Sequence, residues 1–192
     1  MSEPNPSQVT VGAGTLWTAP IGTPEPAVGV LSPVTSPATT VSWPSAWTQL
    51  GYTAEGNEFD WTPKMDPLEV AESLLPVRYV ASSAEAKIAF AAAEITASHI
   101  SAAFNGGTVT TASGITTFTP PVLGSEVRLM IGWDRIDGLE RIIWRQCIQT
   151  GDVKQTHKKA PAMNTIPMEF MLEQPATGLS LFVHYFDASL AA

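Results

Sequence analysis

The stretch EVRLMIGWDRIDGLERIIWRQCIQTG, residues 126–151, is the most regular pattern in the chain. Apolar residues alternate with others on both sides of Asp137-Gly138, a dipeptide that favours a two-residue turn between strands. The residues expected on one face of the two strands are Val127, Leu129, Ile131 and Trp133, then Ile142, Trp144 and Ile148. The stretch therefore predicts a β-hairpin that turns one face to a core.

Similar alternation recurs on both sides of this hairpin. In GNEFDWT, residues 56–62, Phe59 and Trp61 are predicted to point inward, whereas Glu58 and Asp60 lie on the opposite face. Further strands are expected at residues 9–20, 77–83, 85–95, 163–173 and 178–186. Sixteen prolines and fourteen glycines break up helical patterns between these strands. The sequence therefore predicts a mainly β fold.

One short helix is expected at residues 96–105. Thr96 or Ser98 can cap its N-terminus, and Asn105-Gly106 is a stop signal. Its apolar side chains fall on a single stripe, which predicts that the helix flanks a sheet rather than standing alone.

Three segments carry no strand periodicity. Residues 1–8 are polar and are expected to form an N-terminal arm, and residues 62–76 carry prolines that predict a protruding loop or a short helical turn. Residues 21–44 are rich in proline and almost uncharged, which is typical of an extended arm laid on a partner, with a free loop as the alternative. With 192 residues in total, we expect one domain whose arms and loops contact neighbouring subunits.

The overall composition excludes several classes of protein. The net charge of -8 disfavours a protein that grips DNA, because such binding neutralises phosphates with Lys and Arg. Only 15% of the residues are charged and 44% are hydrophobic, which indicates surface covered by partners. Cys147 is the single cysteine, so no internal disulfide can form. We find neither a leader pattern in MSEPNPSQVT nor an apolar run long enough to span a membrane, and we expect a soluble protein that is not exported by a leader.

The residues that could carry chemistry do not form a known motif. His99, His157 and His184 lie far apart, and none has a second ligand at metal-binding spacing. Ser98 and His99 are adjacent on the expected helix, so their side chains diverge and do not form a nucleophile with its base. We therefore expect no enzyme activity and no catalytic, cofactor-binding or metal-binding residues.

Two sets of residues indicate binding surfaces. The six tryptophans are typical of a sheet core or a subunit interface, although Trp43 and Trp47 could also serve a carbohydrate-binding β-sandwich. A basic cluster could seat against an acidic neighbouring subunit or lie in a solvated loop; it consists of Lys154, His157, Lys158 and Lys159.

Four stretches in a fixed order resemble a known family. They are VGAGTLWTAP at residues 11–20, W-x-x-LGYTAEG at 47–56, the strand ending at Glu94 before ITASHISAAFNGG, and the late hairpin. Together they resemble the major tail proteins, or tail tube proteins, of long-tailed phages of the type seen in actinobacteria. The resemblance extends from about Val11 to Tyr185, with the proline-rich residues 21–44 as the segment that departs from the pattern.

This resemblance implies a β-sandwich or barrel-like subunit with one flanking helix. Such subunits form rings, usually of six, that stack into a tube around a channel for double-stranded DNA during genome ejection. The implied location is the virion tail, assembled in the cytoplasm of the bacterial host, with the tape-measure protein and other tail proteins as partners, DNA only in passage, and no membrane. Another tail or virion component, or a tube protein of a type VI-like secretion system, is the alternative.

Candidate site residues follow from the same resemblance. Glu58 and Asp60 are candidates to line the channel, or else face outside water. The candidate subunit-interface residues are Pro24, Pro26, Val30, Leu31, Trp43, Trp47, Met65, Leu68, Lys158 and Lys159.

Overall fold

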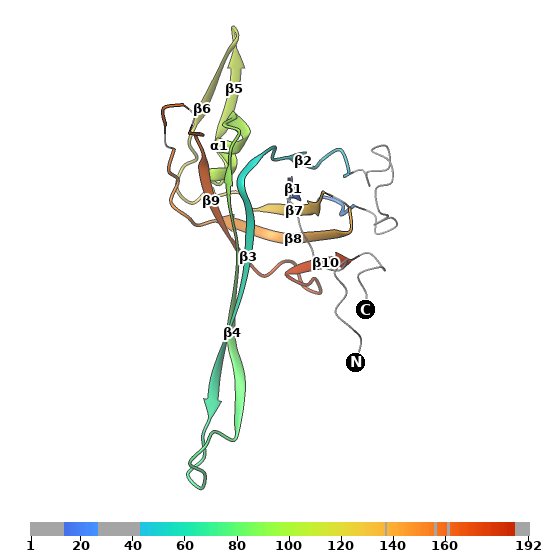
Figure 1. The fold of residues 1–192 in the computed structure, drawn as a ribbon, viewed down its shortest axis with the longest axis vertical. Coiled ribbons are helices and arrows are strands. Elements are labelled where there is room, and N and C mark those ends of the chain that lie inside the picture. The colour runs from blue at the N-terminus through green and yellow to red at the C-terminus, as the bar shows by residue number, and fades with distance from the viewer. Residues whose placement is uncertain (1–13, 27–42, 137, 156, 161, 187–192) are drawn as a thin grey trace.

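The computed structural model describes residues 14–26, 43–136, 138–155, 157–160 and 162–186 (Figure 1). In chain order the elements of this part are β1 (Gly14–Pro20), β2 (Thr48–Gln49), β3 (Thr53–Leu68), β4 (Arg78–Ala92), α1 (Ala97–Ala103), β5 (Thr108–Ala112), β6 (Ile115–Thr119), β7 (Leu129–Arg135), β8 (Glu140–Gln149), β9 (Ile166–Leu172) and β10 (Phe182–Phe186). The prediction of a mainly β fold with one short helix is confirmed. The expected N-terminal arm and most of the proline-rich segment, including Val30 and Leu31, lie outside the described residues.

Eight strands form one sheet in the order β2-β1-β7-β8-β9-β4-β3, and β10 pairs with β8. All the pairings are antiparallel. The sheet does not close into a barrel; its fold is sandwich-like, as predicted. Strands β5 and β6 form a separate two-stranded sheet.

The main core joins the β1-β7-β8 part of the sheet to the β9-β4 part. Leu16, Trp144, Ile88 and Phe170, from β1, β8, β4 and β9, are each almost completely buried in it. Phe90 stacks on Phe170 with ring centroids 5.8 Å apart. Because hydrophobic stabilisation scales with the apolar area removed from water, these strands supply the main source of stability.

A second, smaller core lies on the other face of β7 and β8. Met130 and Ile143 each follow or precede a residue of the main core and therefore point to the opposite face. The chain just before β2 covers this face with Trp43 and Trp47. Trp43 also stacks on Trp17 of β1, with ring centroids 5.2 Å apart.

The alternation in β8 is broken by a bulge. Ile131 pairs with Trp144, but Leu129 pairs with Cys147, so β8 holds one extra residue in this interval. Cys147, and not Ile148, therefore joins the main core, and the prediction for Ile148 was wrong. Val127 precedes β7 and is half-exposed, so the prediction that it shares the core face was also wrong.

The turn between β7 and β8 is longer than the predicted two residues. The strands end at Arg135 and resume at Glu140, and the N–H of Gly138 donates to the carbonyl of Arg135 at 2.8 Å. Gly138 has φ 72°, a conformation that glycine adopts without strain. Asp137 lies outside the described residues.

Helix α1 lies within the predicted range. The side chain of Thr96 caps it by accepting the N–H of His99, as one of the two candidate caps predicted. The buried imidazole of His99 is also hydrogen-bonded through Nδ1 to the carbonyl of Glu94. His99 therefore serves the junction between β4 and α1.

Candidate assembly surfaces

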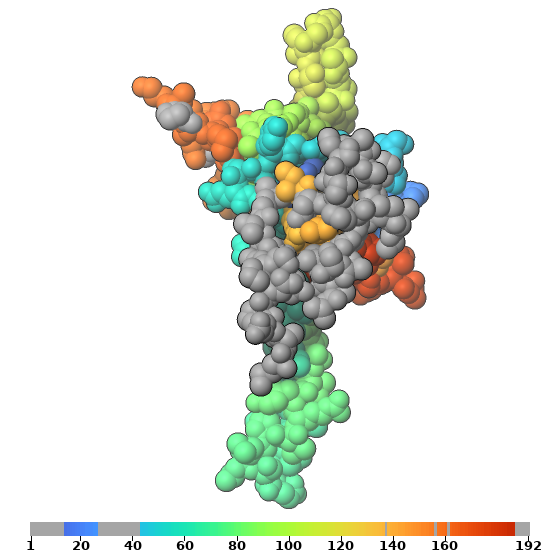
Figure 2. Space-filling view, turned by 45° about the vertical axis from the view of Figure 1, so that its right-hand side comes forward, coloured from blue at the N-terminus to red at the C-terminus, as the bar shows by residue number. Residues whose placement is uncertain are grey.

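The most conspicuous surface is an arm made by the outer halves of β3 and β4. The two strands remain paired from Thr53 and Ala92 out to Leu68 and Arg78, far beyond the body of the protein (Figures 1 and 2). From residue 62 to residue 75 every position is exposed. We name residues 62–84, the outer parts of the two strands with their turn, the arm.

The arm runs through prolines that predicted a loop. Pro63 pairs with Ala84 and Pro67 with Tyr79, so the strand continues where we expected it to stop. In the described sheet β3 is the terminal strand, and a proline is tolerated at such an edge because its missing N–H need not serve a neighbour on the open side. The segment 62–76 thus projects as half of a β-hairpin.

Both faces of the arm carry exposed apolar side chains. They include the candidate interface residues Met65 and Leu68, each about half exposed, and the turn residue Leu74, which is fully exposed. The others are Val70, Leu75, Val77, Tyr79 and Val80. A hairpin with only two strands is marginally stable in water, so a surface of this kind is typical of a contact with another chain.

An acidic face lies at the root of the arm. Glu58 and Asp60 point away from the core, as the alternation predicted, and Phe59 packs against the core on the other side. Lys87 of β4 lies between Asp60 and Glu169 of β9, at 3.4 and 3.5 Å from their carboxylates. Glu169, and then Asp60, raise the pKa of Lys87 by stabilising its charged form.

Acids outnumber bases on this face. Register places Glu58 and Glu169 in one row across Ala89, and Glu85 in the row after Asp60 and Lys87. These neighbouring rows therefore carry four carboxylates and one lysine, Lys87. A hollow of about 480 Å³ opens beside them, and Glu58, Glu169 and Lys154 contribute to its wall.

Trp61 is only partly inward. It lies on the same face as Phe59, with its ring centroid 6.2 Å from that of Phe182 in β10, but 46% of it is exposed. Phe59 packs against the main core, whereas Trp61, two residues further along β3, is not among the side chains packed against it. The prediction that Trp61 packs inside was therefore wrong.

Trp43 and Trp47 are buried within the chain and offer little surface to a partner. The indole N–H of Trp43 donates to Asp134 at 2.7 Å, and the guanidinium of Arg141 lies 4.6 Å from the centre of its ring. The indole N–H of Trp47 donates to the carbonyl of Pro24 at 2.9 Å. Burial within the subunit leaves little of either side chain for a subunit interface or for a carbohydrate ligand.

The other candidate interface residues differ in exposure. Pro24 is exposed, whereas Pro26 is buried within the chain and offers little surface to a neighbouring subunit. Between them, Glu25 pairs with Arg145 at 2.6 Å and anchors the start of the proline-rich segment on β8. Lys158 and Lys159 are exposed on the segment between β8 and β9, which projects from the body (orange in Figure 2).

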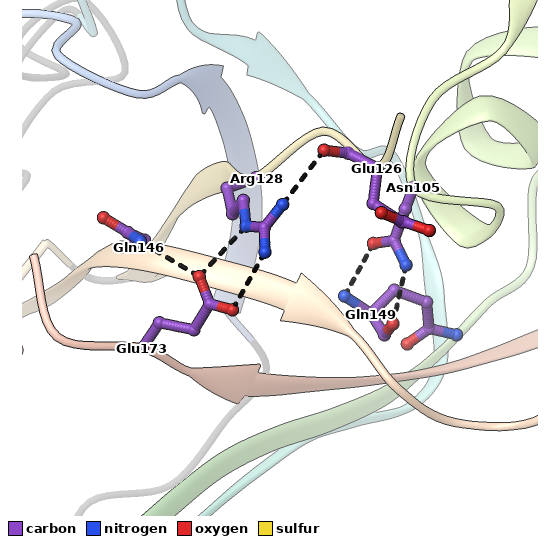
Figure 3. A network of polar contacts seen from close by, with 6 residues as sticks. All are labelled: Asn105, Glu126, Arg128, Gln146, Gln149 and Glu173. Carbon is purple, nitrogen blue, oxygen red and sulfur yellow. Dashed lines mark hydrogen bonds and ion pairs between the residues drawn. The ribbon is translucent and has the colours of Figure 1, made fainter. Parts of the chain in front are cut away.

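A second projection lies at the opposite end of the molecule from the arm. It consists of α1 and the β5–β6 hairpin, which contact each other through Phe104 and Phe118, with ring centroids 5.5 Å apart. Figure 3 shows how side chains tie this end to the sheet. The Asn105 side chain accepts the N–H of Gln149 and donates to its carbonyl, both at 2.7 Å, as a strand partner would.

The same figure shows a charged network beside this clamp. Arg128 donates to both carboxylate oxygens of Glu173, at 3.0 and 3.3 Å, and Gln146 donates to Glu173 at 3.0 Å. These hydrogen bonds, those from Arg128 first, lower the pKa of Glu173. The network joins β8 to the ends of β9 and of the segment before β7.

The described residues hold no group of three or more His, Cys, Asp and Glu placed to bind a metal ion. No helix in this part of the chain is long and apolar enough to cross a membrane. The imidazole of His184 lies 2.6 Å from the carboxylate of Glu140, and His157 is exposed.

A comparison with protein families identifies the family of the chain. The family model described as phage tail tube protein matches residues 1–175. The chain belongs to this family. No curated protein matches the sequence of the chain.

As a phage tail tube protein, the chain is a structural component of the virion tail that assembles into a tube with other tail proteins. The family resemblance carried by the four sequence stretches is confirmed. The sequence analysis missed the length of the arm. Residues 77–92 contain neither proline nor glycine, and this was a signal that one long strand runs through them.

Proposed function

We propose that this tail tube protein forms rings of six subunits that stack into a tube, and that the channel conducts double-stranded DNA during genome ejection. The observation that carries the proposal is the arm, a pair of strands with apolar side chains on both faces and no core of its own to pack against. A free subunit leaves these side chains in water. Assembly with further copies removes them from it.

Ring closure would use the open edge of β3. In the described sheet this strand pairs with β4 alone, which leaves one side of Thr53–Leu68 with unpaired backbone groups. An exposed edge of this length templates pairing with another chain, and a closed ring of subunits leaves no such edge.

The acidic face at the root of the arm would line the channel. Glu58 and Asp60 lie on it, and Lys87 offsets only part of its negative charge. Because phosphates are repelled by carboxylates, DNA would pass such a wall without binding to it.

Other contacts complete the proposal. Met65 and Leu68 of the arm, Pro24, and the exposed Lys158 and Lys159 would meet neighbouring subunits, and the tape-measure protein would be a further partner. Assembly would take place in the cytoplasm of the bacterial host.

Electron microscopy of the purified protein tests the assembly. Negative staining should show rings with six-fold symmetry or tubes built from them, and light scattering should show particles much larger than 20.4 kDa. A compact 20.4 kDa particle at every concentration, with no rings, would contradict the proposal.

Charge reversal tests the channel wall separately. Glu58→Lys should leave ring formation intact, because the residue lies outside the core, but should slow DNA ejection from phage that carry it. Glu58→Gln is the matched control and should lie between the wild type and the lysine variant. Ejection at the wild-type rate in the lysine variant would place this acid elsewhere than the channel.

A further inference from the structure

The end of the molecule opposite the arm carries no ionic charge along a long segment. Residues 96–125 contain no Asp, Glu, Lys or Arg, although the chain as a whole has a net charge of -8. This segment comprises α1, the β5–β6 hairpin and the turn that follows, and we name it the uncharged pole. Its single histidine, His99, is buried.

The uncharged pole exposes large apolar side chains to water. They are Phe104, Val109, Ile115, Val122 and Leu123. Leu74 of the arm and Leu123 of the pole are the two most exposed large apolar residues of the described chain, and Leu123 is 96% exposed. One of these two side chains therefore belongs to the arm and the other to the uncharged pole.

The pole also lacks the features that normally protect a free strand edge. In the described residues β5 and β6 pair only with each other, and residues 108–119 contain neither a charge nor a proline. A two-stranded ribbon of this kind is marginally stable unless something covers it.

The arm and the pole lie at opposite ends of the longest axis of the molecule (Figure 1). A contact between two unlike surfaces at opposite ends does not close between two copies but repeats along the axis, as a stack requires. The arm carries carboxylates near its apolar residues, Asp66, Glu69 and Glu72 among them. An uncharged acceptor is the part of this acidic protein that the arm of another copy can approach without repulsion.

We propose that the end of the arm, with Leu74 and Leu75 foremost, docks on the uncharged pole of the next copy along the tube, around Ile115 and Leu123. The inference rests on the proposed stacking of rings and adds the surface that receives the arm. The occupant of the pole is therefore a second copy of this chain.

Disulfide cross-linking in assembled tubes tests the docking directly. Leu74→Cys is combined with Cys at Ile115, Val122 or Leu123, one pair at a time, because a disulfide tolerates only a narrow range of Cα separations. Mild oxidation should give a ladder of linked chains well beyond dimers with at least one pair, since each copy is joined to the next. Cys147 is buried and burial raises its pKa, so it should not take part.

Two controls define the result. Leu74→Cys alone should give no ladder, and neither should Leu74→Cys with Ile136→Cys, because Ile136 is equally accessible but lies at the β7–β8 turn. A ladder with the Ile136 pair, or no ladder with any pole pair, would overturn the inference.

A charge placed on the pole gives an independent readout. Ile115→Glu with Leu123→Glu should lower the mass of sedimentable tubes about tenfold or more, because docking would bury carboxylates against apolar side chains. The unfolding temperature should stay unchanged, and Ile136→Glu should leave tube formation intact. Normal tubes from the double variant would overturn the inference and leave the proposed function standing, whereas wild-type protein that forms no rings would overturn the function itself.

Discussion

The two halves of β4 have the same partner and different surroundings. Both halves pair with β3, but β9 pairs only with the inner half, from Lys87 to Ala92. In the inner half Ala86, Ile88, Phe90 and Ala92 are buried, whereas every residue from 78 to 85 is exposed. Backbone pairing alone therefore sets the geometry of the outer half, and packing against further strands stabilises the inner half.

This difference is not one of composition. The outer half contains Tyr79 and Val80, which favour strands as strongly as Ile88 and Phe90 do. What the outer half lacks is a layer of the same chain to pack on. Its apolar residues are thus available to another subunit.

The largest expected effect comes from truncating one buried residue of the inner half. Ile88→Ala should lower the free energy of unfolding by about 2–5 kcal/mol, because Ile88 is fully buried and its removal leaves a cavity. Chemical denaturation of the unassembled protein measures this change.

The matched variant lies on the outer half of the same strand. Val80→Ala should change the free energy of unfolding by no more than about 0.5 kcal/mol. Similar losses for the two variants would show that the outer half is packed in the free subunit and would remove the contrast between the halves.

The next effect concerns the tie between the uncharged pole and the sheet. Asn105→Ala removes both hydrogen bonds to the backbone of Gln149 and should cost about 1–3 kcal/mol. Asn105 has φ 55°, so Asn105→Gly is the informative companion, since it loses the clamp but adopts this backbone without strain. An alanine variant much less stable than the glycine variant would assign the loss to backbone strain rather than to the clamp.

A smaller effect is expected at the irregularity where β3 enters the arm-forming hairpin. The register between β3 and β4 changes between Thr53 and Asn57. Gly56 lies within this interval and has φ 85°, and a Cβ added there would meet no other atom. Gly56→Ala should therefore destabilise by about 1 kcal/mol through backbone strain alone. Asn57→Ala, at the next residue, is the control, and an equal loss there would argue against strain at Gly56.

The smallest effect is the pH dependence contributed by Glu173. Its pKa is lowered in the folded protein, so the carboxylate stabilises the fold above the ordinary pKa of 4.5, and this contribution disappears as the pH falls through the folded pKa. Glu173→Gln should therefore be less stable near neutral pH, with a difference in unfolding temperature from wild type that narrows towards pH 3. A difference that stays constant over this range would mean that the ionised carboxylate is not what stabilises the site.

The sequence predicted those features that depend on local patterns. The alternation in GNEFDWT placed Glu58 and Asp60 opposite Phe59, and Thr96 was recognised as a candidate cap. Errors arose where an element depended on a distant partner. Ile148 was misplaced because a bulge leaves no mark in the alternation, and Trp61 because alternation along one strand does not show how far the core beside it extends.

Some parts of the candidate surfaces could not be predicted from one sequence. Trp43 looked like an interface residue because nothing nearby in the chain indicates that Asp134, 91 positions away, receives its indole N–H. The Asn105 clamp likewise joins residues separated by 44 positions. Prolines at 63 and 67 predicted a loop because an open sheet edge, where proline is tolerated, is known only once the strand order is known.

The placement of the arm and the uncharged pole at opposite ends gives any stack joined through them a direction. At one end of such a stack the arms have no pole to dock on, and at the other end the poles have no arm docked on them. The protein that starts the polymer and the protein that stops it must then offer unlike, complementary surfaces. Polarity of the whole tail would in this way be inherited from the asymmetry of a single subunit.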